Sequence, residues 1–278
     1  MSNRIRAAVR ARLVRVVDEV ATAHHHELAA ALTAHHRELE AALTAEINRA
    51  IKAVHEVEFR SRRDLCAAGE REAAASSERF ARAVMPTACT FDHPIATLEH
   101  ALSLAPGVGM ALEFGVATGR TLVVIADARG SKQVFGFDSF QGLPEDWRPN
   151  IPAGTFRTDH LPDVPGAELV VGWFEDTLPD FLAGHPGPVA FLHMDADLYS
   201  STATVLKHVG PRLQPGSVIV FDEYFNYPGW EQHEHRAWQE FAAEYGIEFR
   251  YVAYTSNNEQ VVLVITKIQD SVVEQWDK

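Results

Sequence analysis

The sequence has few of the features that mark disulfide-stabilised or membrane-spanning proteins. Only two of its 278 residues are cysteines, Cys66 and Cys89, which are too few for a disulfide framework and fit a reducing compartment. It contains no run of about 18 apolar residues that would span a membrane. Arginines interrupt the apolar stretch at the start of the sequence, so we expect no signal peptide there. These absences favour a soluble, cytoplasmic protein without a membrane partner.

Basic residues are also scarce. The sequence has 25 basic and 38 acidic residues, which gives a formal net charge of -13. Binding to a nucleic-acid backbone depends on clustered positive charge, so we expect no nucleic-acid partner. Hydrophobic residues make up 46% and charged residues 23%, a balance typical of a globular protein with a normal core.

Proline and glycine are almost missing from the first 85 residues. All 14 prolines lie at or after Pro86, and Gly69 is the only glycine before it. The charge changes as well, because residues 1–85 carry a formal net charge of +2 and residues 86–278 carry -15. We therefore predict two parts, a helical segment over 1–85 and a second domain over 86–278.

The first segment has the composition and periodicity of long helices. Alanine, glutamate and arginine dominate it, and apolar residues recur at steps of three, four or seven from Ile5 to Val54. One helix of that length cannot bury such an apolar stripe by itself. The pattern predicts a coiled-coil-like element that makes the protein a homo-oligomer, and a helical cap folded on the second domain is the alternative. Adjacent histidines point about 100° apart on a helix, so we expect the five between His24 and His36 to be solvated rather than metal-binding.

Short apolar runs alternate with helical segments after residue 86. Near-continuous apolar strands separated by helices predict an α/β fold with a doubly wound, mostly parallel sheet of seven strands, preceded by the N-terminal helical extension. The close spacing of the last two strands predicts an antiparallel edge. The expected strands are 110–115, 133–138, 168–174, 188–195, 217–224, 249–255 and 259–267.

Acidic residues end four of the first five predicted strands. The carboxyl ends of parallel strands meet at one edge of such a sheet, where ligands bind. Carboxylates that gather there repel one another unless a ligand or a cation lies between them. The acidic ends are Glu113, Asp138, Asp195 and the pair Asp222 and Glu223.

The turn after the first of these strands, E-F-G-V-A-T-G, is glycine-rich but differs from dinucleotide and phosphate-binding loops. Gly115 allows a ligand to approach the backbone, and Gly119 eases packing of the next helix. Asp138 ends the second strand about twenty residues later and suits two ribose hydroxyls. Little basic charge lies nearby, so the turn and Asp138 fit a nucleoside without phosphates better than NAD. Trp173 and Phe174 follow the third strand, where they either stack on adenine or belong to the core.

Five segments of the second domain form an ordered series: ALEFGVATGRT, VFGFDSFQGLPEDW, GWFEDTLP, FLHMDADLYSST and VIVFDEYFNYPGW. In this order they resemble the motifs of class I S-adenosylmethionine-dependent methyltransferases. Within these the sequence resembles the macrocin O-methyltransferase family, which methylates sugar hydroxyls on bacterial natural products. The resemblance covers roughly residues 86–266 and implies a Rossmann-like methyltransferase fold, S-adenosylmethionine as methyl donor and a small-molecule acceptor such as a glycosylated metabolite.

The resemblance also implies the cofactor-binding residues. Glu113, Gly115 and Gly119 correspond to positions at the methionine end of the cofactor, and Asp138 corresponds to the ribose contact. Gly172, Trp173 and Phe174 correspond to positions beside the adenine. Ala117 and Ser139, from the first two turns, complete the predicted set.

The same family uses a divalent ion, usually magnesium, and the matching ligands are Asp195, Asp222 and Glu223. Three carboxylates form an oxygen-rich site that suits Mg²⁺ or Mn²⁺ rather than zinc. The family commonly has Asp-Gly-Asp where this sequence has Asp-Ala-Asp at 195–197, and often a second aspartate in place of Glu223. The longer glutamate side chain would shift the ion or weaken its binding.

We predict Asp195 as the catalytic base as well as a ligand, with His193, His233 and His235 as alternatives. The proline-rich stretch 141–166 predicts a lid over the acceptor, with Trp147 as an aromatic platform for a sugar. Two other functional classes stay open from the sequence. One is a different nucleoside-using α/β enzyme such as a dehydrogenase, and the other is a non-catalytic nucleoside-binding protein assembled through its helical segment.

Overall fold

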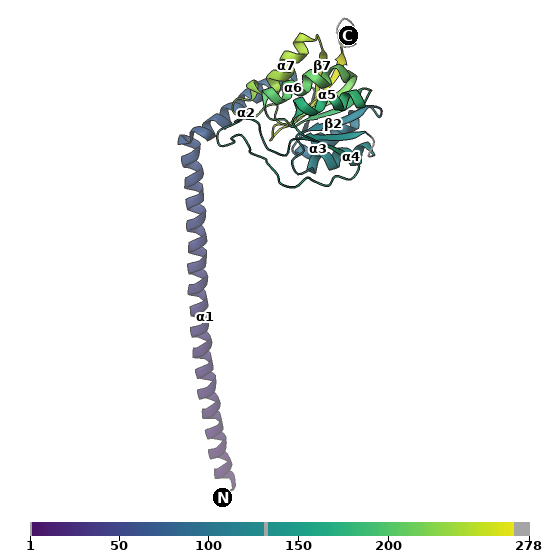
Figure 1. Cartoon of the computed structure of the whole chain (residues 1–278). Helices are drawn as coiled ribbons and strands as arrows, with labels where there is room; N and C mark the ends of the chain where they lie inside the picture. Colours follow the sequence, from purple (N-terminus) through teal and green to yellow (C-terminus); the bar gives the residue numbers. More distant parts are fainter. Residues whose placement is uncertain (1, 131–132, 270–278) are drawn as a thin grey trace. The chain divides into compact units, whose positions relative to one another are not determined.

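The computed structural model describes residues 2–130 and 133–269, and the chain divides into two compact units, one up to Ala68 and one from Gly69 onward (Figure 1). The first unit consists of α1 (Ser2–Arg63) and the beginning of α2 (Leu65–Val84). Asp64 separates the two helices, because its carboxylate accepts the backbone N–H groups of Cys66 and Ala67 and caps α2.

The apolar stripe predicted on the long helix is exposed within this unit. Ile5 is 63% exposed and Leu32 is 72% exposed. None of the helices in the described ranges is long and apolar enough to cross a membrane.

The second unit is built on one sheet, and its described residues contribute eight strands in the order β1-β7-β8-β6-β5-β2-β3-β4. All neighbouring strands are parallel except that β8 runs antiparallel to both β6 and β7. The mostly parallel α/β sheet is therefore confirmed. The strands are β1 (Cys89–Phe91), β2 (Met110–Phe114), β3 (Val134–Asp138), β4 (Glu168–Val171), β5 (Val189–Met194), β6 (Leu213–Phe221), β7 (Glu248–Thr255) and β8 (Val261–Lys267).

Helices pack on both faces of this sheet. Successive side chains of a strand point to opposite faces, so each strand packs against both helix layers. In β2, for example, Ala111 packs on one face and Leu112 on the other. One layer contains α3 (Pro94–Leu104) and α4 (Arg120–Arg129). The other contains α5 (Phe174–Gly184), α6 (Tyr199–Val209), α7 (Glu234–Glu244) and the later part of α2, with the short helices η1 (Gly210–Arg212) and η2 (Trp230–Gln232) in the connections.

The structure corrects two details of the predicted sheet. It has eight described strands rather than seven, because β1 pairs parallel to β7, and a strand of three residues is too short to show a periodic pattern. The antiparallel strand does not form an edge, since β8 lies between β6 and β7 while β1 and β4 lie at the edges.

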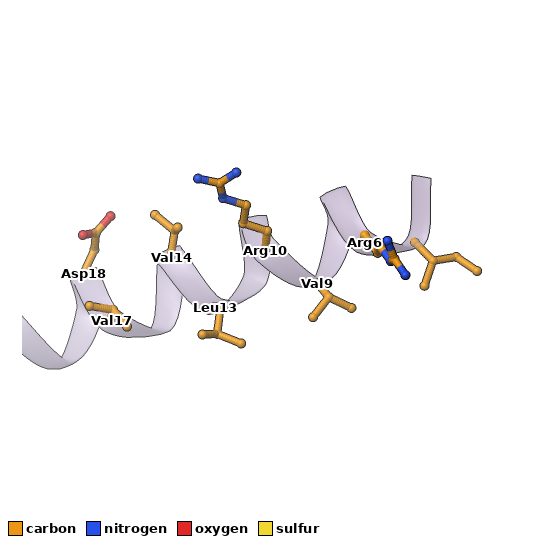
Figure 2. A pocket seen from close by; sticks show the side chains of 8 residues that line it. Arg6, Val9, Arg10, Leu13, Val14, Val17 and Asp18 are labelled. Carbon is orange, nitrogen blue, oxygen red and sulfur yellow. The ribbon is translucent and has the colours of Figure 1, made fainter. Parts of the chain in front are cut away.

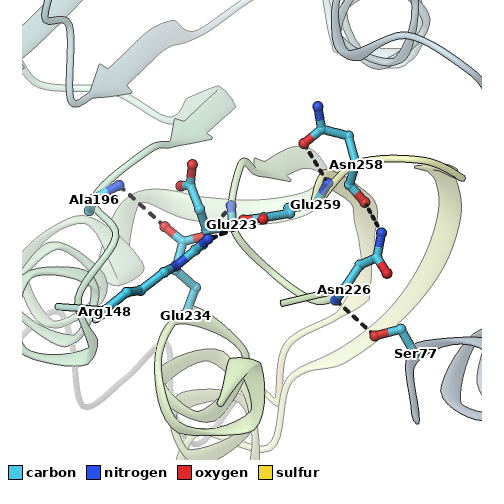
Figure 3. Close-up of polar contacts among 8 residues, drawn as sticks. All are labelled: Ser77, Arg148, Ala196, Glu223, Asn226, Glu234, Asn258 and Glu259. Atoms are coloured by element: carbon cyan, nitrogen blue, oxygen red, sulfur yellow. Dashed lines mark hydrogen bonds and ion pairs between the residues drawn. The ribbon is translucent and has the colours of Figure 1, made fainter. Parts of the chain in front are cut away.

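The second unit also begins earlier than the predicted boundary near residue 85. Ser77 of α2 accepts the backbone N–H of Asn226 at 2.8 Å (Figure 3), and the ring of Phe80 lies 5.3 Å from that of Trp230. Composition grouped α2 with α1 because both are rich in alanine and lack proline. Its contacts instead make the part from Gly69 onward a component of the sheet domain.

Candidate active site

The carboxyl ends of β2, β3, β5 and β6 surround a cavity of about 280 Å³. These ends gather there because the four strands are parallel neighbours in the sheet. The rest of the lining comes from the loop after β3 and from the starts of α5 and α6. The predicted site residues that line the cavity are Gly115, Ala117, Asp138, Ser139, Trp173, Phe174, Asp195, Asp222 and Glu223.

The glycines of the turn after β2 allow close approaches of the backbone. Gly115 has a φ of +95°, and a Cβ atom there would lie 1.8 Å from the carbonyl oxygen of Asp195. A Cβ atom on Gly119 would lie 2.7 Å from the side chain of Val164, in the loop after β3. Gly115 thus brings β2 against the end of β5, and Gly119 packs against the loop rather than lining the cavity.

The carboxylate of Asp138 holds this turn in place. Its Oδ2 accepts the backbone N–H groups of Val116 at 3.0 Å and Ala117 at 2.8 Å, and its Oδ1 accepts the N–H of Phe140 at 2.7 Å. A carboxylate has about four lone-pair sites. With three of them used by the backbone, roughly one is left for a ribose hydroxyl, which is less than the bidentate contact expected from the sequence.

Carboxylates gather at the ends of β5 and β6. Oxygens of Asp195, Asp197 and Glu223 lie within 4.8 Å of one another, and we call these three residues the acidic cluster. Asp222 lines the same cavity with a side chain that is 22% exposed. The predicted ligand set contained Asp222 rather than Asp197, and the structure brings both to this cavity.

Burial and mutual repulsion shape the titration of these groups. Burial, followed by the charges of Asp222 and Asp197, raises the pKa of Asp195 well above its ordinary value. Burial and the charges of four neighbouring carboxylates, Asp222 foremost, do the same to the pKa of Glu223. Burial also raises the pKa of Asp197 to about 7, although the guanidinium of Arg148 opposes the shift.

The donor set of the acidic cluster suits a hard divalent cation. The buried Oε2 atom of Glu223 makes no hydrogen bond within the described residues. Carboxylate oxygens are the ligands that Mg²⁺ and Mn²⁺ prefer, and a cation among them would relieve their repulsion. The residues present therefore fit the ion that the sequence resemblance implies.

Glu113 and His193 form a buried ion pair behind the cavity. They are register partners on β2 and β5, so their side chains meet, with Glu113 Oε1 3.0 Å from His193 Nδ1. His193 Nε2 in turn lies 3.7 Å from Asp222 Oδ1. Burial by itself lowers the pKa of His193, but Asp222 and Glu113 raise it well above its ordinary value, which favours the imidazolium.

The loop predicted as a lid lines one side of the cavity, through residues that include Leu143, Trp147 and Phe156. Arg148 fixes this loop to the β7–β8 turn, because both of its terminal nitrogens bond the carboxylate of Glu259, one of them at 3.1 Å. Its guanidinium carbon also lies 3.8 Å from the ring centroid of Trp147 and 3.6 Å from that of Tyr227.

Residues 112–224, from β2 to just beyond β6, match the methyltransferase domain family. This part of the chain is therefore similar to methyltransferase domains.

Relatives of the chain carry related names. It is 31% identical to the 8-demethyl-8-(2,3-dimethoxy-alpha-L-rhamnosyl)-tetracenomycin-C 4'-O-methyltransferase of Streptomyces olivaceus over 150 residues, 44% of this chain and 55% of that protein. It is 30% identical to the mycinamicin III 3''-O-methyltransferase of Micromonospora griseorubida over 158 residues, 46% of this chain and 61% of that protein. The chain therefore spans little more than half the length of these curated relatives.

A solved structure agrees with these matches. The crystal structure of a calicheamicin methyltransferase superposes with a TM-score of 0.51 and 25% identity, covering 63% of this chain and 80% of the other. Together the comparisons confirm the predicted resemblance to class I S-adenosylmethionine-dependent O-methyltransferases, together with the Rossmann-like fold.

Several of the residues predicted for the site lie away from the cavity. Glu113 and His193 pair behind it, at 0% and 1% exposure. A Cβ atom on Gly172 would meet Thr177 of α5 at 2.7 Å, so this glycine serves the turn into that helix. His233 and His235 are likewise absent from the residues that line the cavity.

His233 and His235 lie in positions where their side chains serve the packing of the fold. His235 packs 4.8 Å from the ring of Trp230 and 5.3 Å from that of Phe80, and burial lowers its pKa to about 4. His233 directly precedes α7, and burial lowers its pKa as well.

Three residues in or beside the acidic cluster were not among the site residues predicted from the sequence. Asp197 follows Asp195 by two positions at the same strand end, and this spacing was a signal for it. Arg148 lies in the loop after β3 and Glu234 begins α7, so both are distant in sequence from Asp195. Nothing in their local sequence indicates a role in the site. Their contacts exist only in the folded domain.

Proposed function

We propose that this protein is an S-adenosylmethionine-dependent O-methyltransferase that acts on a hydroxyl group of a sugar or another natural-product acceptor. One cavity joins the glycine turn, Asp138 and an aromatic pair to the acidic cluster, and this observation carries the proposal. Methyl transfer to oxygen needs a nucleoside site and a site for the hydroxyl in direct contact. The printed names of two relatives specify O-methylation, which supports the same reaction here.

The cofactor would lie along the carboxyl ends of β2, β3 and β4. S-adenosylmethionine, when bound, supplies a methyl group already activated on its sulfonium. The turn around Gly115 and Ala117 offers its backbone to the methionine end, and Asp138 has one acceptor site left for the ribose. Trp173 and Phe174 provide an apolar wall that suits adenine.

The acceptor hydroxyl would lie beside the acidic cluster. A divalent cation held there, by Asp195 and Glu223 with Asp222 or Asp197, supplies positive charge that lowers the cost of removing the hydroxyl proton. Asp195 stays the predicted base. Asp197 becomes a second candidate from the structure, because its carboxylate belongs to the cluster and lines the cavity.

The loop over 141–166 would close the acceptor side. Trp147 offers an aromatic face to the cavity, as carbohydrate-binding sites commonly do, and the stacked guanidinium of Arg148 stabilises its position. A relative named for a rhamnosyl-bearing substrate supports a glycosylated acceptor.

The helical unit would join copies of this chain. Near the start of α1 the side chains of Val9, Leu13 and Val17 follow one another along one side of the helix, and those of Arg10, Val14 and Asp18 lie on the other (Figure 2). Burying such a stripe stabilises a long helix, and a second copy presents a stripe of the same length. The cytoplasmic location and the lack of nucleic-acid partners stay predictions from the sequence.

The deciding experiment offers the protein S-adenosylmethionine, Mg²⁺ and a panel of rhamnosylated and unglycosylated acceptors. We expect S-adenosylhomocysteine to form together with a glycosylated product that gains one CH₂ unit by mass spectrometry. Binding of S-adenosylhomocysteine without turnover on any hydroxyl-bearing acceptor would point to the non-catalytic alternative. Failure to bind the cofactor would contradict the proposal.

A further inference from the structure

Glu234 is the first residue of α7, and its side chain is fully buried. Its Oε1 accepts the backbone N–H of Ala196 at 3.2 Å, and its Oε2 accepts the backbone N–H of Glu223 at 3.1 Å (Figure 3). Ala196 stands between two aspartates of the acidic cluster, and Glu223 is itself a member. One carboxylate therefore bonds both segments that carry the cluster.

Capping of its own helix does not explain this arrangement. A capping side chain bonds N–H groups in the first turn of its helix, whereas both partners of Glu234 belong to other segments. Those segments leave the sheet next to each other, because β5 and β6 are parallel neighbours with Met194 opposite Phe221. Glu234 links them from a third element, α7.

Burying the side chain of Glu234 costs free energy, and its hydrogen-bond partners offset part of that cost. A buried charge without hydrogen bonds is strongly unfavourable. Here two N–H donors and the N-terminal end of α7 offset part of that cost, while burial and the charge of Asp197 still raise the pKa of Glu234 well above its ordinary value. Glu234 is not among the residues that line the cavity, so its effect on a ligand is indirect.

The geometry points to Glu234 as a positioning residue that sets the spacing between the segments of Asp195 and Glu223, and with it the affinity of the acidic cluster for a divalent cation. This inference rests on the metal site of the proposed function. Groups that hold metal ligands in place change metal affinity by about 10–100-fold when they are removed.

The test is calorimetric titration of Mn²⁺ into the full-length protein, without cofactor or acceptor, in the wild type and in Glu234→Gln. Glutamine keeps the shape but has one acceptor oxygen, so one of the two N–H groups loses its partner. We expect the Mn²⁺ dissociation constant to rise about 10–100-fold while S-adenosylhomocysteine affinity is unchanged. Glu231→Gln makes the same substitution at an exposed position three residues earlier and should bind Mn²⁺ like the wild type.

The possible failures are distinguishable. A wild-type protein that binds no Mn²⁺ overturns the metal site itself. Equal Mn²⁺ affinity in Glu234→Gln and the wild type, or equal weakening in Glu231→Gln, overturns the positioning role, as does parallel loss of S-adenosylhomocysteine binding.

Circular dichroism measures whether Glu234→Gln is folded, which the titration requires. If Glu234→Gln does not fold, Glu234→Asp takes its place, since it keeps both oxygens on a side chain too short to reach both segments. Weaker Mn²⁺ binding in folded Glu234→Asp supports the inference, and wild-type binding overturns it. If neither variant folds, Glu234 is required for the stability of the whole domain, and the positioning role is overturned.

Discussion

The backbone of Gly115 lies directly against that of Asp195, so that a Cβ atom on Gly115 would stand 1.8 Å from the Asp195 carbonyl oxygen. This contact joins the turn proposed for the cofactor to the first residue of the acidic cluster. It exists because β2 and β5 are parallel neighbours whose ends coincide, with Phe114 opposite Met194. The two halves of the proposed active site therefore share one backbone contact.

The Gly115→Ala variant should lose about 2–5 kcal/mol of unfolding free energy, since overpacking costs about 1–3 kcal/mol and a non-glycine residue at positive φ about 1–2 kcal/mol. Gly130→Ala is the matched control, because Gly130 also has a positive φ, +62°, but among the described residues no atom beyond its chain neighbours lies within 4 Å of its Cβ position. The Gly130→Ala variant should lose only the about 1–2 kcal/mol of unfolding free energy that a non-glycine residue at positive φ costs. Urea unfolding of both variants measures the difference, and equal losses would contradict the contact.

Replacing Asp138 by asparagine should weaken S-adenosylhomocysteine binding about 10–150-fold, the equivalent of 1.5–3 kcal/mol for charged hydrogen bonds. Asparagine replaces one carboxylate oxygen, which accepts hydrogen bonds, with an NH₂ group, which donates them. That NH₂ group cannot bond the backbone N–H groups that Asp138 now holds. Asp127→Asn, at an exposed site on α4, should bind normally. Calorimetry on variants with unchanged thermal melting is the measurement. Wild-type affinity in folded Asp138→Asn would place the cofactor elsewhere.

Removal of divalent ions should stop methyl transfer, and added Mg²⁺ or Mn²⁺ should restore it. Asp195→Asn should lower kcat at least about 10²-fold, the usual scale for a general base, with little change in cofactor affinity. Asp222→Asn should instead raise the Mg²⁺ concentration needed for half-maximal rate. Turnover assays over a Mg²⁺ series with each variant test these expectations.

Asp197→Asn separates the two candidates for the base. A large loss of kcat in Asp197→Asn with a small loss in Asp195→Asn would move the role of base to Asp197. Full activity in chelator would refute the metal-assisted reaction altogether.

Arg148→Lys should raise the KM for the acceptor about tenfold while leaving kcat and cofactor affinity nearly unchanged. Lysine keeps the charge but loses the two-pronged bond to Glu259 and the planar stack on Trp147 and Tyr227. Loss of charged hydrogen bonds worth about 1.5–3 kcal/mol accounts for the size of the effect. The same change at Arg157, in the same loop but exposed, is the control. An unchanged KM in Arg148→Lys would mean that this contact does not order the acceptor side.

Leu39→Glu should weaken self-association, raising the dissociation constant about 10–100-fold per chain, because a buried leucine contributes about 1.5–3 kcal/mol. Leu39 is 54% exposed on the apolar stripe of α1. Ala41→Glu introduces the same charge on the opposite side of the helix and should have little effect. Light scattering over a micromolar concentration series measures the mass. A monomeric wild type would contradict the homo-oligomer.

Local patterns in the sequence were enough to predict the long helix, every strand except β1, and the acidic residues at the strand ends. The three- and four-residue steps in the first segment predicted α1, and continuous apolar runs such as that ending at Met194 predicted the strands of the parallel sheet. Because parallel strands end at one edge, the positions of Asp138 and Asp195 in the sequence also predicted that they share a cavity. Those inferences depend only on periodicity and on the order of elements, which a single chain displays.

Tertiary structure decided which side chains meet. The register of β2 against β5 pairs Glu113, a predicted cofactor-binding residue, with His193. The bonds of Glu234 to Ala196 and Glu223 follow from the docking of α7 against two strand ends. Such contacts join residues that are distant in the chain, and their geometry depends on packing of whole elements. No local pattern of residues encodes them.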